Sequence, residues 1–184
     1  MERSGRLAGG RREPRVESFA PVVGDDPRIL ILGSMPGVRS LQAGEYYAHP
    51  RNRFWTILES LGLIPPGLPY ENRTMAVAAR GIALWDVLRS CERPGSLDSS
   101  IVKATEEPND VGELLRKHPT IRTIAFNGAK AESAFRRHVA PSLPLKARQH
   151  LETFRLPSTS PAHAISAERK LEAWRRILQL LEPS

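Results

Sequence analysis

The chain is poor in cysteine and in lysine. Among its 184 residues Cys91 is the sole cysteine, which excludes an intramolecular disulfide and a cysteine-based metal cluster. Only five of the 27 basic residues are lysines, so arginine carries most of the positive charge. Arginine suits bidentate contacts to phosphate, although an arginine-rich composition also accompanies genomes rich in G and C. The net charge of +7 favours an anionic partner such as nucleic acid.

Other signals are absent as well. No apolar run approaches the length of a membrane span, and the N-terminus lacks the apolar segment of a signal peptide. The histidines show no zinc-like spacing, and neither a Walker loop nor a dinucleotide fingerprint is present. We therefore expect a cytoplasmic monomer without metal, cofactor or membrane contact. Residues 1–16 are basic, glycine-rich and aperiodic, which predicts a disordered arm, and residues 17–184 suit a single domain.

Apolar runs alternate with helical patterns along the chain. Strands are predicted at residues 28–32, 82–85, 121–126 and 154–156. Helices are predicted at residues 54–63, 71–79, 110–117, 129–139 and 165–181, with residues 141–150 irregular. This order predicts an α/β fold, a three-layer α/β/α sandwich around a central four-stranded parallel sheet.

Polar residues follow each predicted strand. Ser34 follows the first strand, Asp86 the second, Asn127 the third and residues 158–163 the fourth. The carboxyl ends of parallel strands meet at one edge of a sheet, where open α/β folds bind ligands. The sequence therefore predicts one site at that edge.

Two stretches after the first strand form a longer pattern: residues 33–37, GSMPG, and residues 46–55, YYAHPRNRFW. The pattern resembles the first motif of the uracil-DNA glycosylase superfamily, above all its hypoxanthine-DNA glycosylase branch, with mismatch-specific uracil glycosylases as more distant relatives. Residues 81–87, 126–128 and 158–164 support the resemblance, which covers residues 19–181. It implies a monofunctional glycosylase of base-excision repair that acts on duplex DNA, with single-stranded DNA as a second partner. The implied base is hypoxanthine first and uracil second.

The prediction of which residue positions the catalytic water depends on Met35 and Asn52. Met35 stands where mismatch-specific uracil glycosylases carry an asparagine, and a thioether cannot activate water. The resemblance moves the catalytic role to Asn52, because the hypoxanthine branch is thought to use the asparagine at this position. Its side-chain carbonyl can orient a water, and loop N–H groups at residues 33–37 can stabilise charge on the leaving base. The alternative for Asn52 is a cap of the following helix.

Base binding is predicted for residues 34 and 35 of the first motif and for four further side chains. Tyr47 matches the stacking aromatic of the relatives, with a core or rim position as the alternative. His49 is predicted to contact the base or a phosphate, against a structural role. Asp86 and Asn127 are predicted to read a purine edge, and their alternatives are a cap or arginine pair and a simple turn.

DNA contacts are predicted for Arg51 and for the loop around residues 158–163. Ser158, Thr159 and Ser160 are small donors suited to phosphate, and His163 or Ile165 is the predicted wedge that enters the duplex. The alternative for Ser160 is a cap of the last helix. In many relatives a His or Asn precedes Pro-Ser, whereas here Ser160 precedes Pro161. The alternative to an enzyme is a noncatalytic damage-sensing or nucleic-acid-binding domain with the same fold, which Met35 favours.

Overall fold

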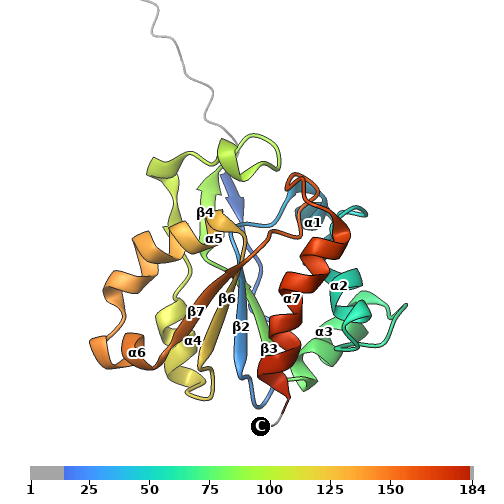
Figure 1. The fold of residues 1–184 in the computed structure, drawn as a ribbon. Helices are drawn as coiled ribbons and strands as arrows, with labels where there is room; N and C mark the ends of the chain where they lie inside the picture. The colour runs from blue at the N-terminus through green and yellow to red at the C-terminus, as the bar shows by residue number, and fades with distance from the viewer. Residues whose placement is uncertain (1–14, 183–184) are drawn as a thin grey trace, which may run out of the picture.

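The structure is a computed structural model that describes residues 15–182. Its central sheet has four parallel strands in the order β3-β2-β6-β7, which confirms the predicted sheet (Figure 1). The strands are β2 (Ile29–Gly33), β3 (Ile82–Asp86), β6 (Thr123–Asn127) and β7 (Glu152–Leu156). The site of interest lies at their carboxyl ends.

Strand β2 occupies the middle of the sheet because its side chains are apolar on both faces. Ile29 and Ile31 pack into one hydrophobic cluster, and Leu30 and Leu32 pack into the other. Successive side chains of a strand point to opposite faces, so an uninterrupted apolar run is stable only where both faces are covered. The run thus places β2 in the interior of the sheet, with helices packed on both of its faces.

Helices cover both faces and complete the three layers (Figure 1). The first cluster includes residues of α2 (Phe54–Ser60), α3 (Tyr70–Ala79) and α7 (Ala167–Leu181). The second includes residues of α4 (Val111–Lys117) and α5 (Ala129–Ala134). The predicted α/β/α sandwich is confirmed.

The last helix begins two residues later than predicted. Ser166 is the N-cap of α7, and its hydroxyl accepts a hydrogen bond from the N–H of Arg169 at 3.3 Å. The alternative in which Ser160 caps this helix is therefore wrong. The helix is amphipathic, and Trp174 and Ile177 are buried against the sheet.

A second, antiparallel sheet was not predicted. It consists of β1 (Arg15–Glu17), β4 (Leu88–Glu92) and β5 (Glu107–Pro108) in the order β1-β4-β5. Residues 15 and 16, expected in the disordered arm, therefore belong to a strand that pairs with β4. The rest of the expected arm lies outside the described residues.

Several shorter elements also differ from prediction. The expected loop after β2 contains α1 (Val38–Ala43), and the segment expected to be irregular contains α6 (Leu145–His150). Helix α5 continues as a π-helical turn, Phe135–Val139. The 3₁₀ turns are Asp98–Ser100, Lys103–Thr105 and Ala140–Ser142. Within residues 15–182 no helix combines the length and apolar character of a membrane span.

Candidate functional site

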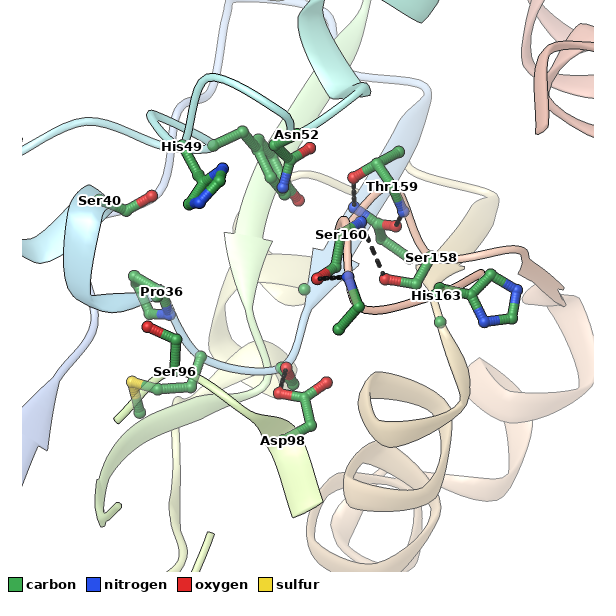
Figure 2. A pocket seen from close by; sticks show the side chains of 18 of the residues that line it. Pro36, Ser40, His49, Asn52, Ser96, Asp98, Ser158, Thr159, Ser160 and His163 are labelled. Carbon is green, nitrogen blue, oxygen red and sulfur yellow. Dashed lines mark hydrogen bonds between the residues drawn. The ribbon is translucent and has the colours of Figure 1, made fainter. Parts of the chain in front are cut away.

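A cavity of about 740 Å³ opens at the carboxyl ends of the parallel strands (Figure 2). Five segments that are distant in the sequence surround it, each by most of its residues: the 33–37 loop, the 46–52 segment, the 96–99 segment, the 127–130 turn and the 157–163 loop. Its volume falls in the range of small-molecule sites. The predicted convergence of polar strand ends is therefore present in the structure.

The carbonyl groups of the 33–37 loop are all hydrogen-bonded. The oxygens of residues 33 and 34 accept from the N–H groups of Val87 and Leu88, and that of residue 37 accepts from Leu41. The oxygens of residues 35 and 36 accept from the guanidinium of Arg93, which is 1% exposed. The carbonyl dipoles of the loop are thus fixed by the surrounding protein, which stiffens the backbone beside the cavity.

Residues 34 and 35 lie in this loop, as predicted, but their side chains have protein partners. The Ser34 hydroxyl donates to Oδ1 of Asp98 at 2.6 Å. Met35 is buried and packs in the hydrophobic cluster on the α4–α5 side of the sheet.

Asp86 is buried at the end of β3, directly beside β2. A Cβ atom on Gly33 would collide with its Oδ1, so a glycine is required there for the carboxyl to fit. Burial, and next the charge of Asp98, raises the pKa of Asp86 to about 8, against a smaller lowering by Arg93. The carboxyl is therefore protonated at neutral pH, and its Oδ2 has no hydrogen-bond partner in the protein. The alternative of an arginine pair is not what the structure shows, because no arginine of the described residues forms an ion pair with Asp86 and its Oδ2 has no partner.

Tyr47 lies in the cavity wall with an uncommon backbone conformation. Its φ angle of 57° is in the left-handed region, which non-glycine residues seldom adopt. The ring stacks on Phe54 with 3.8 Å between centroids and 19° between planes. Its hydroxyl is buried without a partner, and burial, followed by the charge of Asp86, raises the pKa of Tyr47. Tyr47 is thus a rigid aromatic surface backed by a second ring.

His49 and Asn52 come from the same turn and both line the cavity. Nδ1 of His49 accepts a hydrogen bond from the N–H of Arg51 at 3.1 Å. A neutral imidazole bonded in this way carries its proton on Nε2, and in Figure 2 the ring points into the cavity. Oδ1 of Asn52 accepts from the N–H of Phe54, two residues further on, at 3.0 Å. The N-cap residue of α2 is Arg53, so Asn52 closes a turn just before the helix and the helix-capping alternative is not what the structure shows. A carbonyl oxygen has a second lone pair, which leaves room for another donor.

Asn127 and Thr159 are joined by two hydrogen bonds, drawn in Figure 2. The side-chain N–H of Asn127 donates to the Thr159 hydroxyl, and the N–H of Thr159 donates to Oδ1 of Asn127, each at 2.9 Å. Asn127 therefore ties the end of β6 to the 157–163 loop. One amide proton of Asn127 remains beyond this pair of bonds.

Three further hydrogen bonds hold the 157–163 loop in place. Trp174 donates to the carbonyl of Pro157, and the N–H of Arg53 donates to that of Thr159, both at 3.0 Å. Lys170, only 3% exposed, donates to the carbonyl of Ser160 at 3.0 Å. Burial, followed by the charge of Arg53, lowers the pKa of Lys170. The loop is therefore a rigid edge of the cavity with a cation beneath it.

The two serines of this loop accept hydrogen bonds from its own backbone. The Ser158 hydroxyl accepts from the N–H of Ser160, and the Ser160 hydroxyl accepts from the N–H of Ala162, each at 3.2 Å. A hydroxyl that accepts from the backbone still has its own proton to donate. Both groups lie at the cavity, where they can donate to an anion.

Basic groups also reach the cavity. Arg39 and Arg51 are exposed residues that line it. Lys130, at the start of α5, lines it too, but its ammonium group is paired with Glu106, whose side chain is 0% exposed. Within residues 15–182 no cluster of His, Cys, Asp or Glu side chains has the grouping of a metal site.

The structure brings together nearly all of the residues predicted from the sequence. The cavity is lined by Ser34, Met35, Tyr47, His49, Arg51, Asn52, Asp86, Asn127, Ser158, Ser160 and His163. Ile165 is not among its lining residues. In Figure 2 the imidazole of His163 points away from the centre of the cavity.

Sequence reasoning missed Arg93, Asp98 and Lys130. Arg93 and Asp98 lie in a polar loop after an unpredicted strand, and no local pattern connects them to the 33–37 loop. Lys130 follows the Asn-Gly turn at the end of β6, and this position at a strand end is the one signal that pointed to it.

Comparisons with known proteins agree with this geometry. A protein named hypoxanthine DNA glycosylase from Methanosarcina barkeri is 33% identical over 86% of this chain and 94% of its own length. A protein of the same name from Methanosarcina acetivorans is 33% identical over 88% and 96%. The solution NMR structure of a candidate uracil DNA glycosylase from M. acetivorans superposes with a TM-score of 0.76, 32% identity and coverage of 92% of this chain and all of that one.

A sequence model of one family also matches most of the chain. The match runs over residues 20–182 and therefore includes all four parallel strands and the whole cavity. The chain belongs to the uracil DNA glycosylase superfamily.

Proposed function

We propose that this protein is a monofunctional DNA glycosylase that hydrolyses the N-glycosidic bond of a deaminated base flipped out of DNA, with hypoxanthine as the preferred base and uracil as a second. The names of the Methanosarcina relatives support the base, and family membership supports the reaction. Because the cavity is formed by residues 33–163, we propose that the single domain predicted for residues 17–184, to which β1 adds residues 15 and 16, carries the whole activity.

The observation that carries the proposal is the fixed 33–37 loop. When the bond between C1′ and the base nitrogen breaks, its electron pair leaves with the base, so negative charge develops there. All five carbonyls of the loop are bonded to the surrounding protein, whereas within the described residues the N–H groups of Met35 and Gly37 have no hydrogen-bond acceptor. Donors fixed beside developing charge stabilise a transition state without reorganisation.

The base itself has partners of suitable chemistry. Hypoxanthine presents N1–H beside the C6 carbonyl, and uracil presents the same pair of groups on its own edge. A protonated carboxyl such as that of Asp86 both donates and accepts, so it matches this edge. Tyr47, backed by Phe54, offers a flat surface for stacking, and His49 offers an Nε2 donor.

Asn52 is assigned to the water. Its Oδ1 accepts one hydrogen bond from the N–H of Phe54 and can accept another from a water that attacks C1′. The oxygen of that water becomes the new hydroxyl on C1′, and its released proton balances the charge of the departing base. Arg51, Ser158 and Ser160 are assigned to DNA phosphates, because they line the cavity and have protons to donate.

Single-turnover assays on duplexes with one deoxyinosine, deoxyuridine, deoxyxanthosine or mismatched thymidine test the proposal. The expected result is an abasic site, fastest from deoxyinosine. Tight binding to lesion DNA without an abasic product from any duplex would support the noncatalytic damage-sensing alternative and overturn the proposal.

A further inference from the structure

A lysine is buried behind the 157–163 loop without an acidic partner. Lys170 lies in the first turn of α7, which starts directly after this loop (Figure 1). Its side chain does not line the cavity, and its ammonium group donates a hydrogen bond to the carbonyl of Ser160. Within residues 15–182 it forms no ion pair with a carboxylate, and the one charge that acts on it is that of Arg53, a second cation.

The surroundings of Lys170 disfavour a positive charge. Burial, followed by the charge of Arg53, lowers the pKa of Lys170. The N-terminus of a helix carries a partial positive charge, which opposes a cation in the first turn. Glu168, the acidic residue of that turn, is exposed and is not paired with Lys170. The ammonium group therefore adds positive potential that the free protein does not neutralise.

The lysine that lines the cavity shows the usual arrangement. The ammonium group of Lys130 is paired with Glu106, whose carboxylate is fully buried. A buried charge is costly unless an opposite charge accompanies it. Lys170 lies at the same end of the molecule and departs from this rule.

The hydrogen bond to Ser160 does not by itself account for a charged group. Two other carbonyls of the same loop are held by uncharged donors, because the indole of Trp174 donates to Pro157 and the backbone N–H of Arg53 donates to Thr159. A side-chain amide also has N–H donors and no charge to bury. The positive charge of Lys170 therefore indicates a function beyond the fastening of the loop.

The other side of the loop presents hydroxyl groups to the cavity. The hydroxyls of Ser158 and Ser160 accept from backbone N–H groups and keep their own protons to donate. Both residues line the cavity, and Figure 2 shows their side chains at its edge. Hydroxyl donors in front of the loop and an unneutralised cation behind it together suit a phosphate group.

We propose that Lys170 supplies the positive charge of a phosphate site at the 157–163 loop, and that its missing partner is a phosphate of the DNA strand that carries the flipped base. This rests on the proposed action on DNA. Charges inside a protein are weakly screened, so a cation behind one stretch of backbone still attracts an anion in front of it. Lys170 is thus a positioning residue that touches no DNA and acts across the loop.

Lys170→Gln removes the charge and keeps an N–H donor for Ser160. The ligand is a duplex with one deoxyinosine that carries a 2′-fluoro group, which resists hydrolysis, and binding is measured by fluorescence anisotropy over a series of salt concentrations. At low salt the variant should bind about tenfold more weakly than the wild type, and the slope of log affinity against log salt concentration should be shallower by up to about one.

Lys146→Gln is the matched control, because it removes the same charge from the surface. Lys146 is exposed on α6 and does not line the cavity. Its affinity should stay within about twofold of the wild type, with an unchanged salt slope, because exposed charges more than about 10 Å away are screened. An equal loss in both variants would show that net charge alone attracts the DNA and would overturn the proposal.

Urea unfolding without DNA separates this role from a structural one. If Lys170 only fastened the loop, Lys170→Gln would be less stable than the wild type and would bind DNA with the wild-type salt slope, which would overturn the proposal. If its charge is unneutralised, the free variant should be at least as stable as the wild type. Lys170→Met, which is neutral and apolar, should show the same shallower slope.

The two proposals fail differently. Weaker and less salt-dependent binding by Lys170→Gln, without an abasic product from any cleavable duplex with the wild type, would retain the phosphate site and reject the glycosylase. An abasic product from the wild type, together with wild-type affinity and salt slope in Lys170→Gln, would retain the glycosylase and reject the phosphate site.

Discussion

Arg93 donates a hydrogen bond from Nη2 to the carbonyl oxygen of Pro36 at 2.5 Å. Its other hydrogen bonds also go to backbone carbonyls, those of Met35 and Gly95. A buried guanidinium therefore lies directly behind the loop that we propose faces the leaving base. It fixes the loop carbonyls and places a positive charge on the side where negative charge is expected to develop.

Replacement of Arg93 by Gln should lower the single-turnover rate on deoxyinosine duplex by about 100-fold. Without Arg93 the loop N–H groups are no longer fixed toward the leaving base, and loss of one such donor has an effect of this scale. Lys keeps the charge but not the planar fork, so Arg93→Lys should fall between Gln and wild type. Urea unfolding of each variant separates this effect from loss of folded protein. A wild-type rate in folded Arg93→Gln would contradict this role.

Asp86 should control the alkaline side of the pH–rate profile. Its pKa is raised to about 8, so the carboxyl is neutral below that pH and ionised above it. An ionised Asp86 beside a departing anion opposes bond breaking, and the single-turnover rate should fall as the pH rises through about 8. Asp86→Asn keeps a donor and an acceptor without ionising, so its profile should be flat there. A wild-type rate that rises through pH 8 would show that the carboxylate is the active form.

The same group should make the protein less stable as the pH rises. Between the ordinary pKa of 3.8 and the raised value of about 8, the unfolded chain releases the Asp86 proton and the folded chain retains it. The free energy of unfolding should therefore decline with pH across this window, by at most about 1.4 kcal/mol per pH unit. Asp86→Asn should flatten the slope between pH 5 and 8 in urea titrations. An equal slope in the variant would contradict the raised pKa.

Lys130 lines the cavity. A lysine amine in an active site can form a Schiff base with a carbonyl group of the substrate. Its ammonium group is paired with buried Glu106, which also accepts hydrogen bonds from Arg137 and His138. Burial raises the pKa of Glu106, but the bonds from Lys130 and His138 outweigh it and leave the pKa lowered. Glu106 thus stays ionised and holds the Lys130 side chain in an ion pair, so the amine is not free for nucleophilic attack.

Borohydride added during turnover should therefore trap no covalent protein–DNA adduct, and Lys130→Arg should produce abasic sites at a rate within about threefold of the wild type, because Arg can retain the ion pair with Glu106. Denaturing gels that resolve free and cross-linked protein provide the measurement. A trapped adduct that disappears in Lys130→Arg would show that the protein is also a lyase.

The parallel sheet could be predicted because its strands are signalled locally. Strands β2, β3 and β6 are mostly apolar runs bounded by polar or turn-forming residues, and β2 is apolar on both faces. Strand β7 gives a weaker signal, the alternation of Phe154 and Leu156 with polar residues. Strand β4 could not be recognised in the same way, since Leu88–Glu92 mixes polar and apolar residues. Its stability comes from pairing with β1 and β5, whose residues are distant in the sequence. Propensity in a five-residue segment does not report such partners.

The site could be predicted where strand ends place side chains, and not where long-range contacts decide their roles. Ser34, Asp86 and Asn127 follow three parallel strands, so the fold itself brings them together. That Asn127 is bonded to Thr159, and that Arg93 holds Pro36, depends on partners 32 and 57 residues away in the chain. The wedge at His163 or Ile165 stays a prediction that relied on loop composition alone, and of these two residues only His163 lines the cavity.

The central proposal is that Asn52 positions the attacking water, and Asn52→Ser is the variant that tests this role separately from folding. Serine forms the same side-chain bond to the backbone two residues on as asparagine does, although more weakly, so Ser can replace the bond to the N–H of Phe54 and keep the fold. A serine hydroxyl is shorter and cannot place a carbonyl oxygen beside C1′. Thermal unfolding of the variant should remain close to that of the wild type.

The decisive measurement is the single-turnover rate of abasic-site formation from deoxyinosine duplex by wild type and Asn52→Ser at saturating protein. The predicted result is a loss of about 100-fold or more in the variant, with unchanged affinity for the duplex. A variant that is folded, bound to DNA and as fast as the wild type would contradict the assignment of the water to Asn52.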